Sequence, residues 1–203
     1  MGFYADRILP HLIHLAMRQE TFLPYRQRLV DGVRGRVLEV GIGSGLNVAL
    51  YPAAADAVVG LDPSSRLLRR ARGIQRPGES LDLLEGVAEA LPLDDQTFDT
   101  VVSTWTLCSI PDVNAALREI RRVLKPSGQF LFVEHGRAPD ARVALWQDRL
   151  TPMWKRLAGG CHLNRPIRQL VEDAGFDLAR LETGYMGGPT PMTYMYEGVA
   201  RPV

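Results

Sequence analysis

The stretch R-V-L-E-V-G-I-G-S-G-L-N at positions 36–47 decides the fold of this chain. Its first half is a short apolar run, and its second half carries Gly41, Gly43 and Gly45. This order predicts a buried strand, a tight turn and the start of a helix. Because glycine has no Cβ, such a turn can approach a ligand closely and leave amide N–H groups free at a helix N-terminus. The stretch therefore predicts a ligand-binding loop with Glu39 at its edge.

The spacing of the glycines excludes one class of ligand. A dinucleotide fingerprint needs G-x-G-x-x-G, and its third glycine would stand where this chain has Leu46. The pattern here is E-x-G-x-G-x-G. Further features along the chain indicate which ligand this second spacing serves.

The composition bounds the kind of protein. The 203 residues are enough for one domain with a proper core and too few for two ordinary ones, so we expect a single domain over 1–203. No apolar run approaches the roughly 18 residues of a membrane span, and a net charge of +1 argues against a nucleic-acid surface. Cys108 and Cys161 form no C-x-x-C pair, so we expect no disulfide scaffold, no bound metal and a reducing, cytoplasmic location. The oligomeric state is not predicted.

The first thirty residues have a helical pattern. Apolar residues recur from Leu9 to Met17 with the spacing of an amphipathic helix, and we expect residues 1–30 to form a helical lid. His11 and His14 point away from the centre of the apolar stripe, so we expect both to be solvated.

The rest of the chain alternates between strands and helices. Buried strands are predicted at 57–61, 81–85, 98–103 and 129–133, with helices at 46–51, 64–73 and 111–124 between them. A helix at 143–157 interrupted at Pro152, a helix at 167–174 and a strand pair at 178–185 and 192–200 follow. This order predicts a doubly wound α/β fold with a mostly parallel sheet of about seven strands.

Asp62 and Pro63 come directly after the second predicted strand. In nucleotide-binding α/β folds, an acidic side chain at this point accepts hydrogen bonds from ribose hydroxyls. The alternative is that Asp62 or Ser64 caps the helix that follows. The distance along the chain from Gly45 to Asp62 matches a βαβ unit, which favours the ribose interpretation.

Together these features resemble the class I S-adenosylmethionine (SAM)-dependent methyltransferases. The resemblance covers about residues 36–176 and rests on Glu39, the three glycines, Asp62, A-E-A-L-P at 88–92 and E-I-R-R-V-L-K-P-S-G at 119–128. It implies a Rossmann-like methyltransferase fold, SAM as cofactor and a small-molecule methyl acceptor. The SAM-binding residues that it implies are Glu39, Gly41, Gly43, Gly45, Asp62, Pro63, Ala88, Glu89, Ser103 and Thr104. The chain departs from the family at Val87, where an Asp usually contacts the adenine.

A narrower resemblance is to the methyltransferase-like thiol S-methyltransferases. It rests on T-W-T-L-C-S-I at 104–110, V-E-H-G at 133–136, W-Q at 146–147 and G-G-C-H-L-N-R at 159–165. It implies a thiol acceptor. The hydrophobic N-terminal anchor of the animal members is missing, so we do not expect their membrane residence to carry over.

Three residues are the candidates for catalysis. Glu134 and His135 follow the fifth predicted strand, and we expect them to face the same crevice as Cys108. With an unperturbed pKa near 6.5, His135 is the preferred general base for deprotonating a thiol. The alternative is that Glu134 or His135 caps the next helix or pairs with an arginine. We expect Trp105 and other aromatic residues to line the pocket, namely Phe3, Tyr4, Trp146 and Trp154.

Several other functions stay open at this point. A quinone or phenol methyltransferase, or a phospholipid methyltransferase, would use the same cofactor half. A non-catalytic SAM-binding protein would share it without turnover. A metal or arsenic role for Cys108, Cys161 and His162 is a further alternative, for which two cysteines are few.

Overall fold

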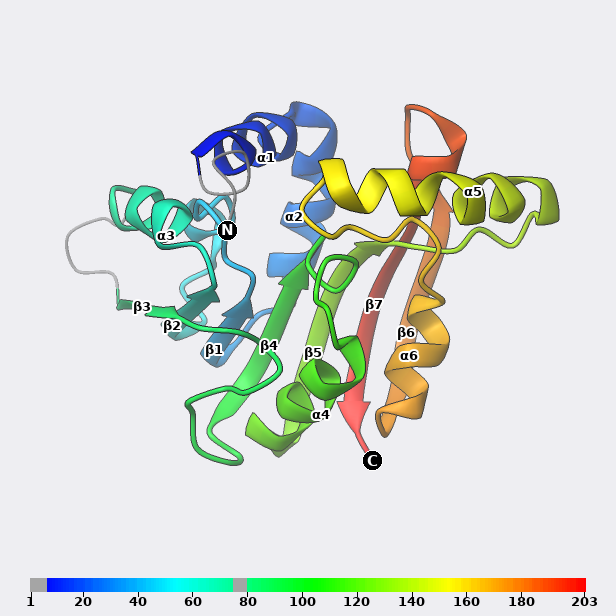
Figure 1. Cartoon of the computed structure of the whole chain (residues 1–203). Helices are drawn as coiled ribbons and strands as arrows, with labels where there is room; N and C mark the ends of the chain where they lie inside the picture. The colour runs from blue at the N-terminus through cyan, green and yellow to red at the C-terminus, as the bar shows by residue number, and fades with distance from the viewer. Residues whose placement is uncertain (1–6, 75–79) are drawn as a thin grey trace.

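The computed structural model describes residues 7–74 and 80–203. Within them a seven-stranded sheet has the order β3-β2-β1-β4-β5-β7-β6 (Figure 1). Strands β1 to β5 pair in parallel, and β7 runs antiparallel between β5 and β6. The strands are β1 Gly35–Val40, β2 Ala55–Asp62, β3 Leu81–Glu85, β4 Phe98–Thr104, β5 Leu124–His135, β6 Phe176–Tyr185 and β7 Tyr194–Pro202. The predicted doubly wound, mostly parallel sheet is confirmed.

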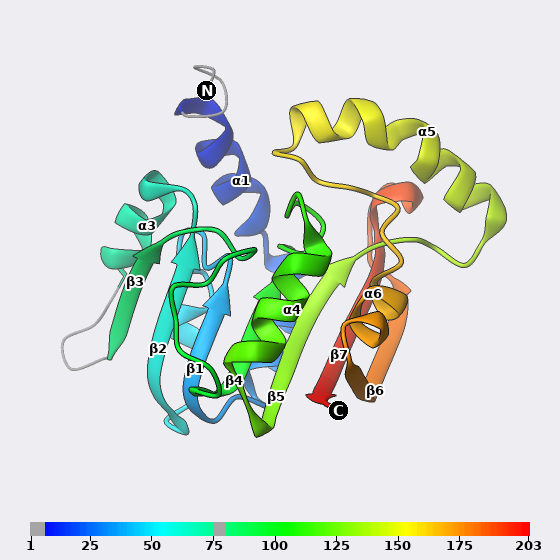
Figure 2. The same ribbon diagram turned by 60° about the horizontal axis from the view of Figure 1, so that its bottom comes forward.

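Helices cover both faces of the sheet and one of its ends. The helices are α1 Leu9–Met17, α2 Leu23–Val30, α3 Ser65–Arg72, α4 Val113–Val123, α5 Ala141–Leu157 and α6 Ile167–Asp173. Helices α4 and α6 share one buried apolar cluster with the sheet, and α2 and α3 share the other. Helices α1 and α5 lie beyond the carboxyl ends of the parallel strands (Figures 1 and 2).

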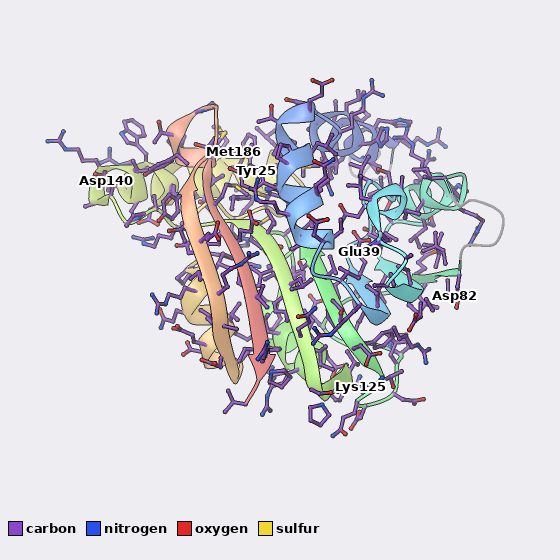
Figure 3. The ribbon with its side chains drawn as sticks, turned by 180° about the vertical axis from the view of Figure 1, so that it is seen from behind. Tyr25, Glu39, Asp82, Lys125, Asp140 and Met186 are labelled. Carbon is purple, nitrogen blue, oxygen red and sulfur yellow. The ribbon has the colours of Figure 1, made fainter. Side chains whose placement is uncertain are left out.

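The alternation of side chains along β1 decides which way Glu39 points. Leu38 and Val40 pack into the cluster that contains α4, whereas Val37 packs into the cluster that contains α2. Because successive strand residues point to opposite faces, Glu39 shares the face of Val37. Figure 3 shows Glu39 at the base of α2, at the end of the sheet opposite to Lys125.

Two local predictions are wrong. The helix predicted at 46–51 is only a 3₁₀ turn over Val48–Leu50, because positive φ angles at Gly43 and Gly45 and the extended Tyr51 before Pro52 leave too few residues for an α-helix. The helix predicted to break at Pro152 runs without interruption through α5. Pro152 is exposed, so water can reach the carbonyl group that loses its N–H partner there.

None of the helices formed by the described residues is both long and apolar enough to cross a lipid bilayer.

Candidate active site

A cavity of about 490 Å³ lies at the carboxyl ends of β1, β2 and β4. It is bounded by the loop after β1, the end of β2, residues 87–89, residues 104–106 and 109–111, and one face of α1. Open α/β sheets bind ligands at this edge, where the strand order reverses. The volume falls within the roughly 300–1,000 Å³ of small-molecule and cofactor sites.

Most of the predicted SAM-binding residues line this cavity. These are Gly41, Gly43, Asp62, Pro63, Ala88, Glu89 and Thr104. Glu39, Gly45 and Ser103 lie behind the lining. Val87 lines the cavity and is 48% exposed, so its isopropyl group stands where the related methyltransferases usually have a carboxylate.

The glycine loop is held open by its backbone conformation. Gly41 has a φ of +74°, and a Cβ on it would lie 2.2 Å from Thr106 Oγ1. Gly43 has a φ of +56°, and a Cβ on it would meet only the Gly41 carbonyl oxygen, at an ordinary contact distance of 3.9 Å. Both conformations favour glycine, and the absence of a Cβ lets the backbone of the loop approach a ligand closely.

Asp62 ties the glycine loop to the start of α3. Its carboxylate accepts hydrogen bonds from Gly43 N at 3.0 Å and from Ser64 N at 2.8 Å. Burial raises the pKa of Asp62, although these two N–H groups oppose the shift. The α3 cap itself is Ser64, whose Oγ accepts from Leu67 N at 3.4 Å. Asp62 therefore faces the cavity with both oxygens oriented, and its contact with ribose stays a prediction.

Glu39 is fully enclosed in a polar network. Its carboxylate accepts hydrogen bonds from Asn47 Nδ2 at 2.7 Å and from the Tyr51 hydroxyl at 2.7 Å. Burial raises its pKa to about 7, against the effect of these donors and of Arg26. Glu39 reaches the cavity through Asn47, which also contacts Arg26 and Thr104.

Arg26 is a site residue that the sequence did not reveal. Its side chain lines the cavity, donates to Asn47 Oδ1 at 2.8 Å and to Met17 O at 3.4 Å, and lies 5.0 Å from the centre of the Trp105 ring. The residue is only 6% exposed, and burial lowers the pKa of its guanidinium. Nothing in the sequence separates it from Arg28, which instead pairs with Glu197 at 2.9 Å.

Trp105 forms part of the cavity wall as predicted from its position, and its backbone is strained. Its φ is +51°, which is uncommon for a residue with a side chain, and its N–H donates to Val133 O at 2.8 Å. The edge of the ring meets Phe22 at a centroid distance of 4.9 Å. Among the other predicted lining residues, Trp146 is exposed, Trp154 lies elsewhere, and Phe3 and Tyr4 fall outside the described residues.

His14 is the histidine that lines the cavity, and its side chain is partly buried. Its Nδ1 lies 2.7 Å from Ser44 Oγ, and burial lowers its pKa, helped by Arg70 and Arg18. It shares one face of α1 with Pro10 and Met17, which also line the cavity. The signal was present in the sequence, because His14 lies four residues after Pro10 and three before Met17. His11, in contrast, is exposed.

The three residues predicted to be catalytic lie behind the lining of the cavity. These are Cys108, Glu134 and His135. Glu134 is completely buried and accepts hydrogen bonds from Ser103 Oγ at 2.9 Å, Thr106 N at 2.9 Å and Leu107 N at 3.0 Å. Burial raises its pKa to about 8. Glu134 thus orders the loop after β4.

His135 belongs to a buried cluster with both cysteines. Its Nε2 lies 3.0 Å from Cys161 Sγ, which also accepts a 3.3 Å hydrogen bond from Trp154 Nε1. Hydrogen bonding from the Cys161 thiol, together with the His135 charge, lowers the pKa of Cys108 well below its usual range. Burial opposes a charge on His135, but the neighbouring Cys108 raises its pKa. His162 does not join the cluster; its Nδ1 lies 3.1 Å from the Cys108 carbonyl oxygen.

Comparisons with known proteins agree with this geometry. The methyltransferase domain family model matches residues 38–132. The human thiol S-methyltransferase TMT1B is 32% identical over 185 residues, which cover 83% of this chain and 70% of that protein. A phosphatidylethanolamine N-methyltransferase of Cereibacter sphaeroides is 37% identical over 165 residues, which cover 78% of both.

A solved structure supports the fold alone. The methyltransferase in complex with the Trm112 methyltransferase activator of Haloferax volcanii superimposes with a TM-score of 0.73 at 20% identity, covering 98% of this chain and 96% of that one. The chain spans between 62% and 70% of the length of the thiol S-methyltransferases that it matches.

Proposed function

This chain belongs to the class I SAM-dependent methyltransferases, near the thiol S-methyltransferases, and from this premise we propose that it transfers the methyl group of SAM to a small thiol. The observation that carries the proposal is the cavity at the carboxyl ends of β1, β2 and β4, where the acidic side chains of Asp62 and Glu89 and the basic side chains of Arg26 and His14 are set among apolar walls. When bound, SAM would supply an activated methyl group.

The residues present fit SAM as a ligand. Asp62 is oriented to accept hydrogen bonds from ribose hydroxyls, and the buried Arg26 guanidinium offers a positive charge to the carboxylate of the amino-acid end. Gly43 has no side chain, which leaves space for the ligand beside Asp62 and Arg26. Glu39 would act through Asn47, by holding the amide that orients Arg26.

The walls suit a reaction in which charge disappears. The cavity lining includes Leu9, Ile13, Trp105 and Ile110, which keep water away from the reacting atoms. The thiol must lie in line with the bond to the methyl group, so the chain contributes mainly by positioning.

We propose that His14 takes the proton of the thiol. Among the residues that the structure describes, His14 is the histidine that lines the cavity. Its pKa is lowered from 6.5, so the imidazole is neutral at pH 7 and can accept a proton. The predicted set of His135, Cys108 and Glu134 would then act from behind the wall, by fixing the loop that carries Thr106 and Ser109.

A screen with methyl-labelled SAM tests this function. The proposal predicts label in small aliphatic thiols and little or none in phenols, quinones and phosphatidylethanolamine. SAM binding without transfer to any acceptor would instead indicate a non-catalytic binding protein. Label found only in phenols or quinones would show that the methyl acceptor is one of these compounds and not a thiol.

One further acceptor has specific support. The relative that is 37% identical is named for phosphatidylethanolamine. Helices α1 and α5 flank the same end of the sheet (Figure 2), and both carry exposed apolar side chains. These side chains are Leu12, Leu15, Leu145, Trp146, Met153 and Leu157. Label in the lipid arm of the same screen would favour phospholipid N-methylation.

Cys108 and Cys161 lie close together and form no disulfide, which suits a reducing compartment, and we propose that the protein is located in the cytoplasm.

A further inference from the structure

Three soft donors converge behind the wall of the cavity. Cys108 comes from the loop after β4, His135 from the end of β5 and Cys161 from the loop after α5. Their Sγ and imidazole nitrogen atoms all lie within 4.8 Å of one another. Among the residues at 7–74 and 80–203, this is the group of cysteine, histidine and carboxylate side chains with the spacing of metal ligands.

Burial makes the cluster unusual for a set of polar groups. Cys108 is 2% exposed, and His135 and Cys161 are each 9% exposed. The Nδ1 atom of His135 is buried and has no hydrogen-bond partner. The nitrogen that faces the Cys161 sulfur is Nε2, so the donors offered to an ion are this nitrogen and the two sulfur atoms.

The donor set selects the kind of ion. Two sulfur atoms and one imidazole suit Zn²⁺, whereas Mg²⁺ and Ca²⁺ prefer oxygen ligands. A tetrahedral Zn²⁺ with bonds of about 2.3 Å to sulfur and about 2.0 Å to nitrogen separates its donors by about 3.5–3.8 Å. The 3.0 Å between His135 Nε2 and Cys161 Sγ and the 4.8 Å limit of the group bracket this spacing.

The surroundings also match those of a metal thiolate. Trp154 Nε1 donates to Cys161 Sγ at 3.3 Å, and Ser109 Oγ lies 3.5 Å from Cys108 Sγ. Such outer hydrogen bonds support and orient metal ligands. We propose that Cys108, His135 and Cys161 bind one Zn²⁺ ion, with the fourth position left for water.

The ion would join three segments that are distant in the sequence. Ser109 and Gly159, which neighbour the cluster along the chain, line the cavity, so the site would fix the shape of that wall. The sequence alone led to the opposite expectation, because the two cysteines have no motif spacing and His135 was assigned to catalysis. The proposal does not depend on methyl transfer.

Titration of the reduced, metal-stripped full chain with Co²⁺, followed by Zn²⁺, tests the site. We expect one equivalent of Co²⁺ to give thiolate-to-metal charge-transfer bands and the strong visible bands of a tetrahedral ion, and Zn²⁺ to bleach them. Cys108→Ser, Cys161→Ser and His135→Gln should each lose the tetrahedral thiolate spectrum. His162→Asn, which removes a neighbouring imidazole outside the cluster, should keep it.

The wild-type titration decides the proposal even if a variant fails to fold. Absence of charge-transfer bands in the folded wild-type protein would overturn it. Retention of the same bands in both cysteine variants would also overturn it, because the sulfur ligands would then lie elsewhere. A rise in the thermal unfolding temperature with Zn²⁺, lost in Cys161→Ser, would support it.

Discussion

Arg26 Nη1 donates a 2.8 Å hydrogen bond to Asn47 Oδ1, and this bond links α2 to the glycine loop. The amide of Asn47 is held in turn by Glu39, whose carboxylate accepts from Nδ2 at 2.7 Å. The buried Arg26 guanidinium, which lines the cavity, is therefore oriented through Asn47 by the Glu39 carboxylate, which does not line it.

The first prediction concerns Arg26. Arg26→Gln should weaken SAM binding by at least about tenfold, since a charge-assisted hydrogen bond contributes about 1.5–3 kcal/mol. Isothermal titration calorimetry measures the change. Arg28→Gln is the matched control, because Arg28 lies on the same helix but pairs with Glu197 outside the cavity lining. Equal affinity in the two variants would remove Arg26 from the SAM site.

The second prediction concerns the glycine loop. Gly41→Ala should lower the free energy of unfolding by at least about 2 kcal/mol, because it combines a positive φ with a Cβ placed 2.2 Å from Thr106 Oγ1. Gly184→Ala should be neutral or slightly stabilising, since nothing lies within 4 Å of its Cβ position. Urea unfolding of both variants provides the comparison. Similar losses in both would mean that the contact with Thr106 does not constrain the loop.

Hydrophobic patterns in the sequence predicted most of the fold, whereas local backbone geometry was harder to predict. The glycine spacing and the apolar runs placed β1, β2, β3 and β4 within two residues of their bounds, because hydrophobic periodicity reports directly on burial. The helix at 46–51 failed because two residues with positive φ and a proline acted together, and each alone is a weaker signal.

The third prediction uses the raised pKa of Glu39. Folding shifts this pKa from 4.5 to about 7, so the folded protein holds the proton more tightly than the unfolded chain. The resulting stabilisation is complete below pH 4.5 and is lost as the pH rises towards 7. Between pH 5 and pH 8 the wild type should lose about 2–3 kcal/mol of stability relative to Glu39→Gln in the absence of SAM. Parallel pH profiles for the two proteins would show that Glu39 is ionised in the folded state.

The fourth prediction separates the two histidines. His14→Gln should lower kcat and abolish the acid limb of the pH profile, which lies below about pH 6.5 in the wild type because the pKa of His14 is lowered. His135→Gln should lower activity while it spares SAM affinity and keeps that limb. Steady-state kinetics with a thiol acceptor measures both. Loss of the limb only in His135→Gln would return the role of base to His135.

The sequence predicted the residues of the candidate site less completely than it predicted the fold. Order along the chain identified Gly41, Gly43 and Asp62, since residues that follow parallel strands meet at one edge of the sheet. Order could not show that His135 lies outside the cavity lining, or that Arg26 and not Arg28 lines the cavity, because both facts depend on packing between distant segments.

The central claim is that the cavity holds SAM, and calorimetric titration of SAM into wild type and Asp62→Asn tests it most directly. The wild type should bind one equivalent of SAM, and Asp62→Asn should bind at least about tenfold more weakly, because the neutral amide is a poorer acceptor for ribose hydroxyls. Asp112→Asn is the matched control: Asp112 caps α4 by accepting from Ala115 N at 2.9 Å and does not line the cavity. Failure of the wild type to bind SAM, or equal affinity in Asp62→Asn and wild type, would contradict the claim.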